Sequence, residues 1–306
     1  MMSQKTILIT GATGFLGSHL VKKFLEEGHT IIVLKRSFSN TLRIDNLLTH
    51  IKTYNIDEYE LKQIFTENQN IDTVIHTATC YGRNNESVSN IVNSNVYFPL
   101  KLLEIATFFN TDTFFNTDTF FNTDTILSSY LNSYSLSKKH FLDWGKQFAE
   151  TKKIKFINLK LEHMFGGGDD DSKFVTYLIK NLLRNIKELN LTKGEQKRDF
   201  IYIEDVVSAY SLLVSKLSGK TEFYKEYQLG SGEAIALKDF VELIRQLTQS
   251  TTKINYGALP YRENEIMFSQ ANIEPLKEKG WQPHCNLVKS LQKTIQIELE
   301  SLNLKS

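Results

Sequence analysis

The first residues of the chain form the pattern that most limits its possible folds. Thr6 to Thr10, "TILIT", is a β-branched apolar run of the kind found in buried parallel strands. It leads into "GATGFLG" and then into "SHLVKKFLEEG", whose apolar residues recur at helical spacing up to Gly28. A strand, a glycine-rich turn and a helix in direct succession predict the first unit of a parallel α/β sheet.

The same alternation continues along the chain. The strand-like segments "HTIIVLKRS", "IDTVIHTAT" and "KFINLKLEH" alternate with helix-like segments such as "NVYFPLKLLEIAT". We therefore predict an α/β fold, a Rossmann-like doubly wound parallel sheet with a smaller C-terminal α/β substrate-binding region. We expect residues 1–165 in the dinucleotide-binding domain, with 198–232 returning to it, and residues 166–197 and 233–306 in the substrate region.

The composition argues against several classes of protein. A formal net charge of +1 over 306 residues gives no strong field for nucleic acid or an anionic membrane. No apolar run approaches the ~18 residues that a membrane helix needs. The two cysteines, Cys80 and Cys285, give neither a disulfide framework nor a metal-ligand spacing, so no metal is expected. The N-terminal "MMSQK" leaves no room for a signal peptide before the first strand, so we expect a cytoplasmic protein.

The glycine turn has the features of a pyrophosphate site. Its G-x-x-G-x-x-G spacing is one residue wider in the first gap than the usual dinucleotide fingerprint. Glycines allow a tight turn, a close backbone approach to the pyrophosphate and close helix–strand packing, and the helix N-terminus attracts the phosphate charge. We favour a dinucleotide site over a merely structural turn. The expected cofactor-binding residues of the turn are Gly11, Thr13, Gly14, Phe15, Leu16 and Gly17.

The end of the second strand indicates which nicotinamide cofactor is bound. An acidic residue there hydrogen-bonds the ribose hydroxyls of NAD, whereas a basic residue accepts the 2′-phosphate of NADP. This sequence has "VLKRS", with Lys35 at the acidic position and Arg36 after it. A guanidinium is a forked, permanently charged donor suited to phosphate. We therefore favour NADP(H), with NAD(H) possible; the alternative is a solvated basic pair at a strand end.

A tyrosine and a lysine in "YSLSK" are candidates for acid–base chemistry. Tyr134 and Lys138 are four residues apart, so on a helix they lie on one face. A phenol has an ordinary pKa near 10, and an ammonium one turn away favours the phenolate. Such a pair can donate a proton to a carbonyl oxygen as hydride reaches its carbon. The alternative is an interfacial tyrosine beside a surface lysine.

Several segments together resemble one family. "TGATGFLGSHL", "VIHTAT", "YSLSK", "KRDFIYIEDV" and "YQLGSGEAIAL" are similar to the motifs of the extended short-chain dehydrogenase/reductases, the NAD-dependent epimerase/dehydratase family. The resemblance implies further cofactor contacts near the adenine, beside the loop after the "VIH" strand, and at the start of the next helix. Ile56 and Asp57 are the residues expected near the adenine. Thr77 and Ala78 are those of the loop, and Asn95 is the one at the start of the helix.

Residues 108–125 repeat the hexapeptide "FFNTDT" three times. Nothing else in the chain repeats, whereas solenoids and propellers have periods of roughly 20–50 residues throughout, so neither is expected. The family places a Ser or Thr at the end of the strand before the tyrosine helix, where it hydrogen-bonds the substrate oxygen. By this resemblance Thr123 is the expected catalytic hydroxyl, with Thr117 as the alternate and Thr111 also able to align. We interpret the repeat as a duplication with no function of its own.

The residues that follow Thr123 narrow the reaction. In the sugar 4,6-dehydratases of the family, Asp and Glu follow the Thr as acid and base, whereas here Asp124 is followed by Thr125. Reductases that also epimerise the sugar use a Cys beside the catalytic Ser and a His after a later loop; this chain lacks both, and the loop reads "FGGGDDD". The resemblance therefore implies hydride transfer at carbon 4 of a sugar.

Three residues of the second half match substrate-binding positions of the family. Arg198 in "KRDF" and Arg262 in "LPYRENE" match residues that bind the nucleotide diphosphate, which two guanidiniums can hold by charge-assisted bidentate bonds. His163 in "LKLEH" either contacts the ligand or packs as a polar residue.

Whole segments, including "NSYSLSKK" and "KGEQKRDFIYIEDVVSAY", are most similar to the CDP-4-keto-3,6-dideoxyglucose reductases, the abequose and paratose synthases of O-antigen biosynthesis. This resemblance implies an NADPH-dependent 4-ketoreductase of a nucleotide-linked deoxyhexose, and a homodimer formed through the Tyr134 helix. Two alternatives stay open: an NAD-dependent nucleotide-sugar 4-epimerase using the same Tyr134 and Lys138, and a non-catalytic NADP-binding regulatory or scaffold protein.

Overall fold

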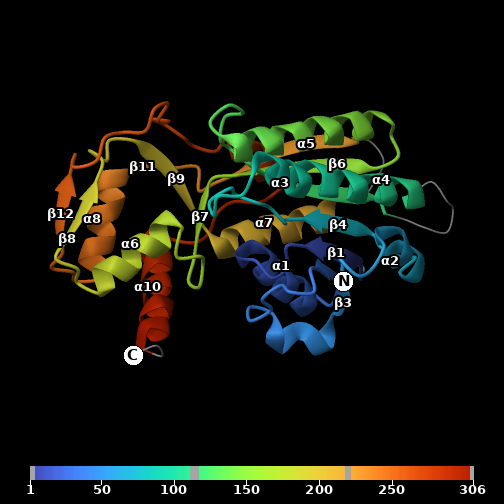
Figure 1. Ribbon diagram of the computed structural model, residues 1–306, viewed down its shortest axis with the longest axis horizontal. Helices are drawn as coiled ribbons and strands as arrows, with labels where there is room; N and C mark the ends of the chain where they lie inside the picture. Colours follow the sequence, from blue (N-terminus) through green and yellow to red (C-terminus); the bar gives the residue numbers. More distant parts are fainter. Residues whose placement is uncertain (1–3, 111–116, 218–221, 304–306) are drawn as a thin grey trace. The chain divides into compact units, whose positions relative to one another are not determined.

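The computed structural model describes residues 4–110, 117–217 and 222–303 (Figure 1). The chain divides into two compact units, Met1–Lys160 with Ala209–Tyr227, and Leu161–Ser208 with Gln228–Ser306. The returning segment is therefore shorter than the expected 198–232. The reason is that the strand Lys197–Tyr202 pairs with strands of the second unit, which keeps 198–208 there.

The first unit alternates strands and helices, as the sequence predicts. Its elements are β1 (Thr6–Thr10), α1 (Phe15–Glu26), β2 (Thr30–Lys35), η1 (Asp45–His50), β3 (Lys52–Asn55), α2 (Leu61–Glu67), β4 (Thr73–His76), α3 (Val88–Val92), η2 (Asn93–Tyr97), α4 (Phe98–Asn110), β5 (Thr119–Thr125) and α5 (Ser133–Glu150). Parts of β6 (Lys155–Leu161), α7 (Ile203–Lys216) and β10 (Tyr224–Leu229) complete it, and the rest of these three elements belongs to the second unit.

The central sheet confirms the predicted doubly wound architecture. Its seven strands follow the order β10-β6-β5-β4-β1-β2-β3. β1 is parallel to β2 on one side and to β4 on the other, and β4 is parallel to β5. From β1, the chain first adds β2 and β3 on one side of the sheet. It then returns to the other side of β1, where β4, β5, β6 and β10 follow in order. This reversal at β1 and β4 is the place where parallel α/β sheets form a ligand crevice at their carboxyl ends.

Aromatic residues on β5 hold helices against both faces of this sheet. Phe120 packs on Phe141 of α5 and stacks on Phe156 of β6, with ring centroids 5.8 Å apart in the second pair. The next residue, Phe121, packs instead on Tyr210 of α7. Successive strand residues point to opposite faces, so α5 and α7 cover opposite sides of the sheet, as Figure 1 shows. The buried sheet is the rigid support of the residues at its carboxyl edge.

The second unit is a smaller α/β assembly. Its elements are β7 (His163–Phe165), α6 (Phe174–Leu183), β8 (Glu188–Leu191), β9 (Lys197–Tyr202), β11 (Ala234–Ala236), α8 (Leu237–Leu247), β12 (Lys253–Tyr256), α9 (Glu274–Glu278) and α10 (Leu287–Asn303). β9 lies between β11 and β7, and β12 pairs with β8. Phe200 and Phe240 stack face to face, with centroids 3.7 Å apart. In the parts of the chain that the structure describes, no helix has the length and apolarity to cross a membrane.

The hexapeptide copies occupy different elements. Phe108 and Phe109 of the first copy lie in the last turn of α4, where Phe109 stacks on Phe65 of α2 at 5.6 Å. The third copy, 120–125, forms nearly all of β5. Thr117 is buried just before that strand, whereas Thr111 lies outside the described residues. The first two residues of the first copy thus belong to the end of a helix.

Candidate active site

The glycine turn has the geometry that a close ligand approach requires. Gly11 has a φ of +71°, and a Cβ there would lie 2.5 Å from the backbone nitrogen of Ala78. A Cβ on Gly17 would lie 2.2 Å from the carbonyl oxygen of Gly11. Gly14 caps α1, so the free amides of the first helical turn point out beside this turn. The structure brings Gly11 next to Thr77 and Ala78, as expected of two loops that share one ligand.

The end of β2 carries the two basic residues predicted to choose the cofactor. The Lys35 ammonium donates to Oδ1 of Asn55 at 2.7 Å, so it is directed towards β3. Arg36 is exposed one residue further on. The carboxylate of Asp57 accepts from the backbone nitrogen of Ser37 at 2.8 Å and from its hydroxyl. These hydrogen bonds hold the pKa of Asp57 below its usual range, so Asp57 braces the basic turn.

Asn95 ties the loop after β4 to the tyrosine helix. Its amide oxygen accepts from the backbone nitrogen of Cys80 at 2.7 Å, and its amide nitrogen donates to the Cys80 carbonyl at 2.8 Å and to the Ser137 hydroxyl at 2.9 Å. Asn95 is fully buried, and both ends of its amide are engaged by the protein. Asn95 therefore positions the loop after β4 against α5.

Helix α5 presents the predicted acid–base pair. Asn132 caps its first turn, accepting from the backbone nitrogen of Ser135 at 2.8 Å, and the Ser135 hydroxyl accepts from the Asn132 nitrogen at 3.1 Å. Tyr134 and Lys138 follow one turn apart on this capped helix. Lys138 is 1% exposed, and burial lowers its pKa to about 8. The charge of this lysine therefore titrates close to neutral pH.

The groups around Tyr134 shift its pKa in both directions. Burial raises the pKa well above the ordinary value, and the nearby Tyr81 and Asp124 raise it further. A hydrogen bond with the Thr125 side chain and the positive charge of Arg83 lower it. Tyr134 is therefore strongly held in the neutral, proton-donating form.

Two threonines at the end of β5, Thr123 and Thr125, have different neighbours. Thr123 pairs with the hydroxyl of Tyr210, at 2.6 Å, on the α7 side of the sheet. Thr125, two residues on at the end of β5, lies close enough to Tyr134 for its side chain to lower the pKa of that phenol. The Thr123 hydroxyl, expected to hydrogen-bond the substrate oxygen, is thus held by a tyrosine of α7 in the structure. A catalytic role for Thr123 stays a prediction.

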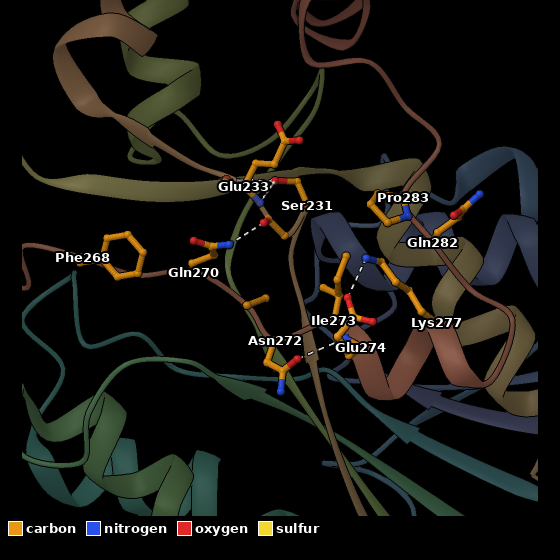
Figure 2. Close-up of a pocket in the computed structure, with 12 residues that line it drawn as sticks. Ser231, Glu233, Phe268, Gln270, Asn272, Ile273, Glu274, Lys277, Gln282 and Pro283 are labelled. Carbon is orange, nitrogen blue, oxygen red and sulfur yellow. Dashed lines mark hydrogen bonds and ion pairs between the residues drawn. The ribbon is translucent and has the colours of Figure 1, made fainter.

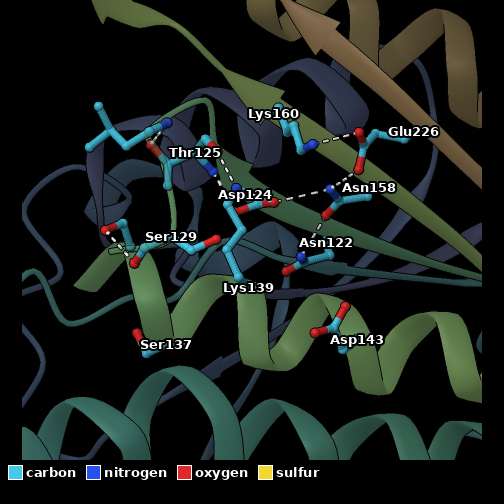
Figure 3. A network of polar contacts seen from close by, with 12 residues as sticks. Asn122, Asp124, Thr125, Ser129, Ser137, Lys139, Asp143, Asn158, Lys160 and Glu226 are labelled. Atoms are coloured by element: carbon cyan, nitrogen blue, oxygen red, sulfur yellow. Dashed lines mark hydrogen bonds and ion pairs between the residues drawn. The ribbon is translucent and has the colours of Figure 1, made fainter. Parts of the chain in front are cut away.

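A buried ion pair fixes the end of β5 against α5 (Figure 3). The Asp124 side chain is fully buried; one carboxylate oxygen lies 3.0 Å from the Lys139 ammonium and 3.1 Å from the Asn158 amide nitrogen. The other oxygen accepts from the backbone nitrogen of Thr125 at 2.7 Å, and Lys139 also donates to the Thr125 carbonyl at 2.6 Å. The pair clamps both backbone polar groups of Thr125. Asp124 is therefore occupied in structure and is not free to act as an acid.

The network continues through β6 and β10. Asn158 receives a hydrogen bond from Asn122 at 2.8 Å and donates to Glu226 at 3.0 Å. Glu226 also accepts from Lys160 at 2.6 Å and from the Tyr224 hydroxyl at 2.9 Å. Burial raises the pKa of Glu226, but these hydrogen bonds outweigh burial and hold it below its usual range. The sequence gives no sign of this network, because the partners come from separate strands.

The second unit holds the three predicted substrate residues. Arg198 is buried and its guanidinium pairs with Glu265 at 2.5 Å. Arg262 is exposed in the same turn as Glu265, whose backbone nitrogen donates to the Arg262 carbonyl at 3.1 Å. His163 is partly exposed, with Nδ1 3.2 Å from the Glu162 carboxylate. The structure thus brings Arg198 close to the Arg262 turn, and Glu265 is a neighbour that the motif comparison missed.

The second unit also contains a hollow of about 580 Å³ (Figure 2). It lies between the 231–233 loop and the 268–277 segment, and Gln270 donates to the Gly232 carbonyl across it at 2.6 Å. None of the three predicted substrate residues lines it. We do not assign it to the candidate site.

One group within the described segments could ligate a metal, namely Asp205, His284 and Cys285. The Asp205 carboxylate already accepts from the backbone nitrogens of His284 and Cys285, at 3.0 and 3.3 Å, and lies 2.8 Å from the His284 ring. Burial raises the pKa of the Cys285 thiol to about 12. In the structure, the Asp205 carboxylate holds the loop before α10 through these contacts. Sequence spacing missed this group because Asp205 is far from the other two residues.

Comparison with known proteins agrees with this fold. The chain matches the NAD dependent epimerase/dehydratase family over residues 7–230. It is 38% identical to a CDP-abequose synthase of Salmonella muenchen, covering 96% of this chain and 98% of that protein. A CDP-abequose synthase of Salmonella typhimurium is 35% identical, with 95% and 97% covered. The solved Thermotoga maritima UDP-glucose 4-epimerase, bound to UDP-glucose, superposes with a TM-score of 0.82 at 23% identity, over 97% of this chain and 99% of that one. This chain belongs to the NAD dependent epimerase/dehydratase family.

Proposed function

We propose that this protein reduces the 4-keto group of a nucleotide-linked deoxyhexose, activated with CDP, using NADPH, in the biosynthesis of surface polysaccharide such as O-antigen. The observation that carries the proposal is the arrangement at the end of β5. Burial holds Tyr134 neutral beside the Thr125 side chain, while the carboxylate that a dehydratase would use is paired with Lys139. Similarity along nearly the whole chain to two CDP-abequose synthases supports the choice of substrate.

The residues of the first unit fit a nicotinamide dinucleotide. The turn can pack this closely on the loop after β4 and on itself only because Gly11 and Gly17 have no Cβ, and the amides of the first turn of α1 beside it suit a pyrophosphate. The exposed Arg36, braced by the Ser37–Asp57 hydrogen bonds, suits the 2′-phosphate that distinguishes NADP from NAD. When bound, the cofactor supplies the hydride.

The protein's own contribution to the reaction is proton transfer. As hydride reaches carbon 4 of the sugar, the C=O π electrons move to oxygen, and Tyr134 gives its phenolic proton to that oxygen. The Thr125 side chain, which lowers the pKa of the same phenol, is proposed to direct it. The buried Lys138 ammonium, one turn away, favours the phenolate that remains. The ketone becomes an alcohol, and the proton is recovered from solvent.

Arg36→Gln is expected to raise the KM for NADPH about 10- to 100-fold, because a charge-assisted hydrogen bond to phosphate is worth roughly 1.5–3 kcal/mol. The KM for NADH should change less than about 2-fold, since NADH has no phosphate there. Steady-state kinetics with both cofactors measures this. The exposed Arg43, changed to Gln, is the matched control. Equal losses with NADPH and NADH would contradict the assignment.

Thr123 and Thr125 of β5 are expected to behave differently. Thr125→Val should lower kcat about 10- to 100-fold, because Tyr134 loses the hydroxyl that orients it. Thr123→Val should instead destabilise the first unit by about 1–3 kcal/mol, because the buried Tyr210 hydroxyl loses its partner. Urea unfolding and kcat measured on both variants separate the two effects. A large loss of kcat for Thr123→Val alone would show that Thr123 is the catalytic hydroxyl, as the family resemblance implies.

The test of the proposed function is NADPH oxidation with a panel of nucleotide-linked 4-keto sugars, with product stereochemistry read by NMR. A 4-epimerase instead holds NAD tightly and interconverts 4-hydroxy epimers without net cofactor use; structural neighbours of this chain bind NAD. Purified protein that carries NAD and ignores NADPH would favour that second function. If Tyr134→Phe left the biological activity intact, a non-catalytic role would replace both. We further propose that the protein is cytoplasmic and that it forms a homodimer. Light scattering of the purified protein tests the homodimer.

A further inference from the structure

A loop of the first unit brings an arginine close to the proton-donating tyrosine. The ring centroids of Tyr81 and Tyr134 are 5.0 Å apart, with the planes at 38°. The guanidinium carbon of Arg83 lies 5.0 Å from the centroid of the Tyr81 ring. Arg83 is therefore at most about 10 Å from the Tyr134 ring, the sum of the two 5.0 Å separations. Charges within about a Debye length, ~8–10 Å, act on one another without full screening.

The backbone fixes this placement. Asn95 holds both polar backbone groups of Cys80, the residue before Tyr81. Gly82, between Tyr81 and Arg83, has a φ of +70°, a conformation that other residues rarely adopt, and a Cβ there would meet the Ile91 side chain at 2.7 Å. This turn carries Arg83 back over the Tyr81 ring. The guanidinium position is therefore built into the loop.

Among the other groups that face Tyr134, some oppose its phenolate and one cation loses its charge as pH rises. From β5, the Asp124 carboxylate opposes formation of the phenolate, although Lys139 is paired with it at 3.0 Å. From the loop, the Tyr81 phenol also opposes it. From α5, burial lowers the pKa of Lys138 to about 8, so this lysine loses part of its charge in mildly alkaline solution. An arginine keeps its charge throughout this range.

We propose that Arg83, seated on the ring of Tyr81, is a second cation of the proton-transfer site and stabilises the phenolate of Tyr134. Its part in turnover rests on the proposed ketoreductase function. Arg83 acts through Tyr134 and is a supporting residue of the site. Neither the sequence motifs nor the YxxxK pair assigns a cation to this loop.

A titration that needs no substrate tests the proposal. Position 134 is labelled with 3,5-difluorotyrosine, a more acidic phenol, and its ionisation is followed by 19F NMR in the full-length protein. Arg83→Gln should raise the apparent pKa by about 0.5–1 unit, the size expected of a partly exposed charge at this distance. Arg83→Lys should keep most of the wild-type value. Tyr81→Phe should change it little, because a neutral phenol carries no charge and the ring that seats Arg83 remains.

Controls separate charge from structure. Arg184→Gln, at an exposed arginine of the second unit, should leave the titration unchanged. The Arg83→Gln shift should shrink as salt is raised, because an exposed charge is screened. If Arg83→Gln titrates like the wild type, or Arg83→Lys like Arg83→Gln, the charge of Arg83 has no such role and the proposal is overturned.

Turnover gives an independent readout. Reduction needs a protonated Tyr134, so kcat falls as pH rises through the pKa of that phenol in the complex. Arg83→Gln raises this pKa, so the alkaline fall in kcat should move up by the same 0.5–1 unit. A wild-type protein that reduces no 4-keto sugar would count against the proposed function alone, because the 19F titration still decides the role of Arg83.

Discussion

Tyr134→Phe is expected to lower kcat for NADPH-dependent reduction about 10³-fold, within the 10²- to 10⁴-fold range of general acid catalysis. The substitution removes only the hydroxyl and keeps the ring that packs against Tyr81 at 5.0 Å. Binding of NADPH should therefore change by less than about 2-fold. Single-turnover loss of NADPH absorbance, with cofactor affinity from fluorescence quenching, measures both quantities.

The neighbouring tyrosine is the matched control. Tyr81→Phe removes a hydroxyl from a ring in the same stack, and the variant should retain kcat within a few-fold. If Tyr134→Phe kept more than a tenth of wild-type activity, the proton would have to come from another group. If both variants lost NADPH binding, the loop would have been disturbed as a whole.

Lys139→Met is expected to destabilise the first unit by about 3 kcal/mol or more. The substitution leaves the fully buried Asp124 carboxylate without its cation, and removing one partner of a buried pair costs roughly 3–5 kcal/mol. It also frees the Thr125 carbonyl that Lys139 holds at 2.6 Å. The free energy of urea unfolding measures this, with near-ultraviolet circular dichroism reporting the packing around Tyr134.

The same helix offers a control for this substitution. Lys146 pairs with Asp143 at 3.5 Å, but their side chains are 46% and 73% exposed, so Lys146→Met should change stability by less than about 0.5 kcal/mol. The double variant Asp124→Asn with Lys139→Met should be more stable than the sum of the single losses predicts, because it leaves no unpaired charge. Equal small effects at Lys139 and Lys146 would show that the buried pair is unimportant.

The parts of the site that the sequence reveals are those built from neighbouring residues. The turn at Gly11 to Gly17 and the pair Tyr134 and Lys138 each depend on a local period, of a tight turn or of one helical turn, so the spacing alone predicts them. The sheet follows from the alternation of buried strands and amphipathic helices. In these places the local preference and the tertiary structure agree.

The parts that the sequence does not reveal depend on where strands and loops end in space. Which threonine meets Tyr134 is decided by Tyr210, a residue of α7 that occupies the Thr123 hydroxyl. The pairing of Asp124 with Lys139 depends on the side chain at the end of β5 facing α5. The seat of Arg83 depends on a left-handed turn at Gly82. Spacing cannot predict contacts of this kind.

The even length of the hexapeptide has a consequence for how this chain finds its final pairing. Residues 107–113, 113–119 and 119–125 all read "TFFNTDT", so three stretches of the chain offer the same side chains to the position of β5. A shift by six residues also preserves which side chains face each helix layer, since strand alternation has a period of two. Only the connections discriminate: with 119–125 in place, residues 126–132 lead directly to α5. The sequence therefore allows three alignments that place the same side chains in β5, and the lengths of the connecting segments select the one that is folded.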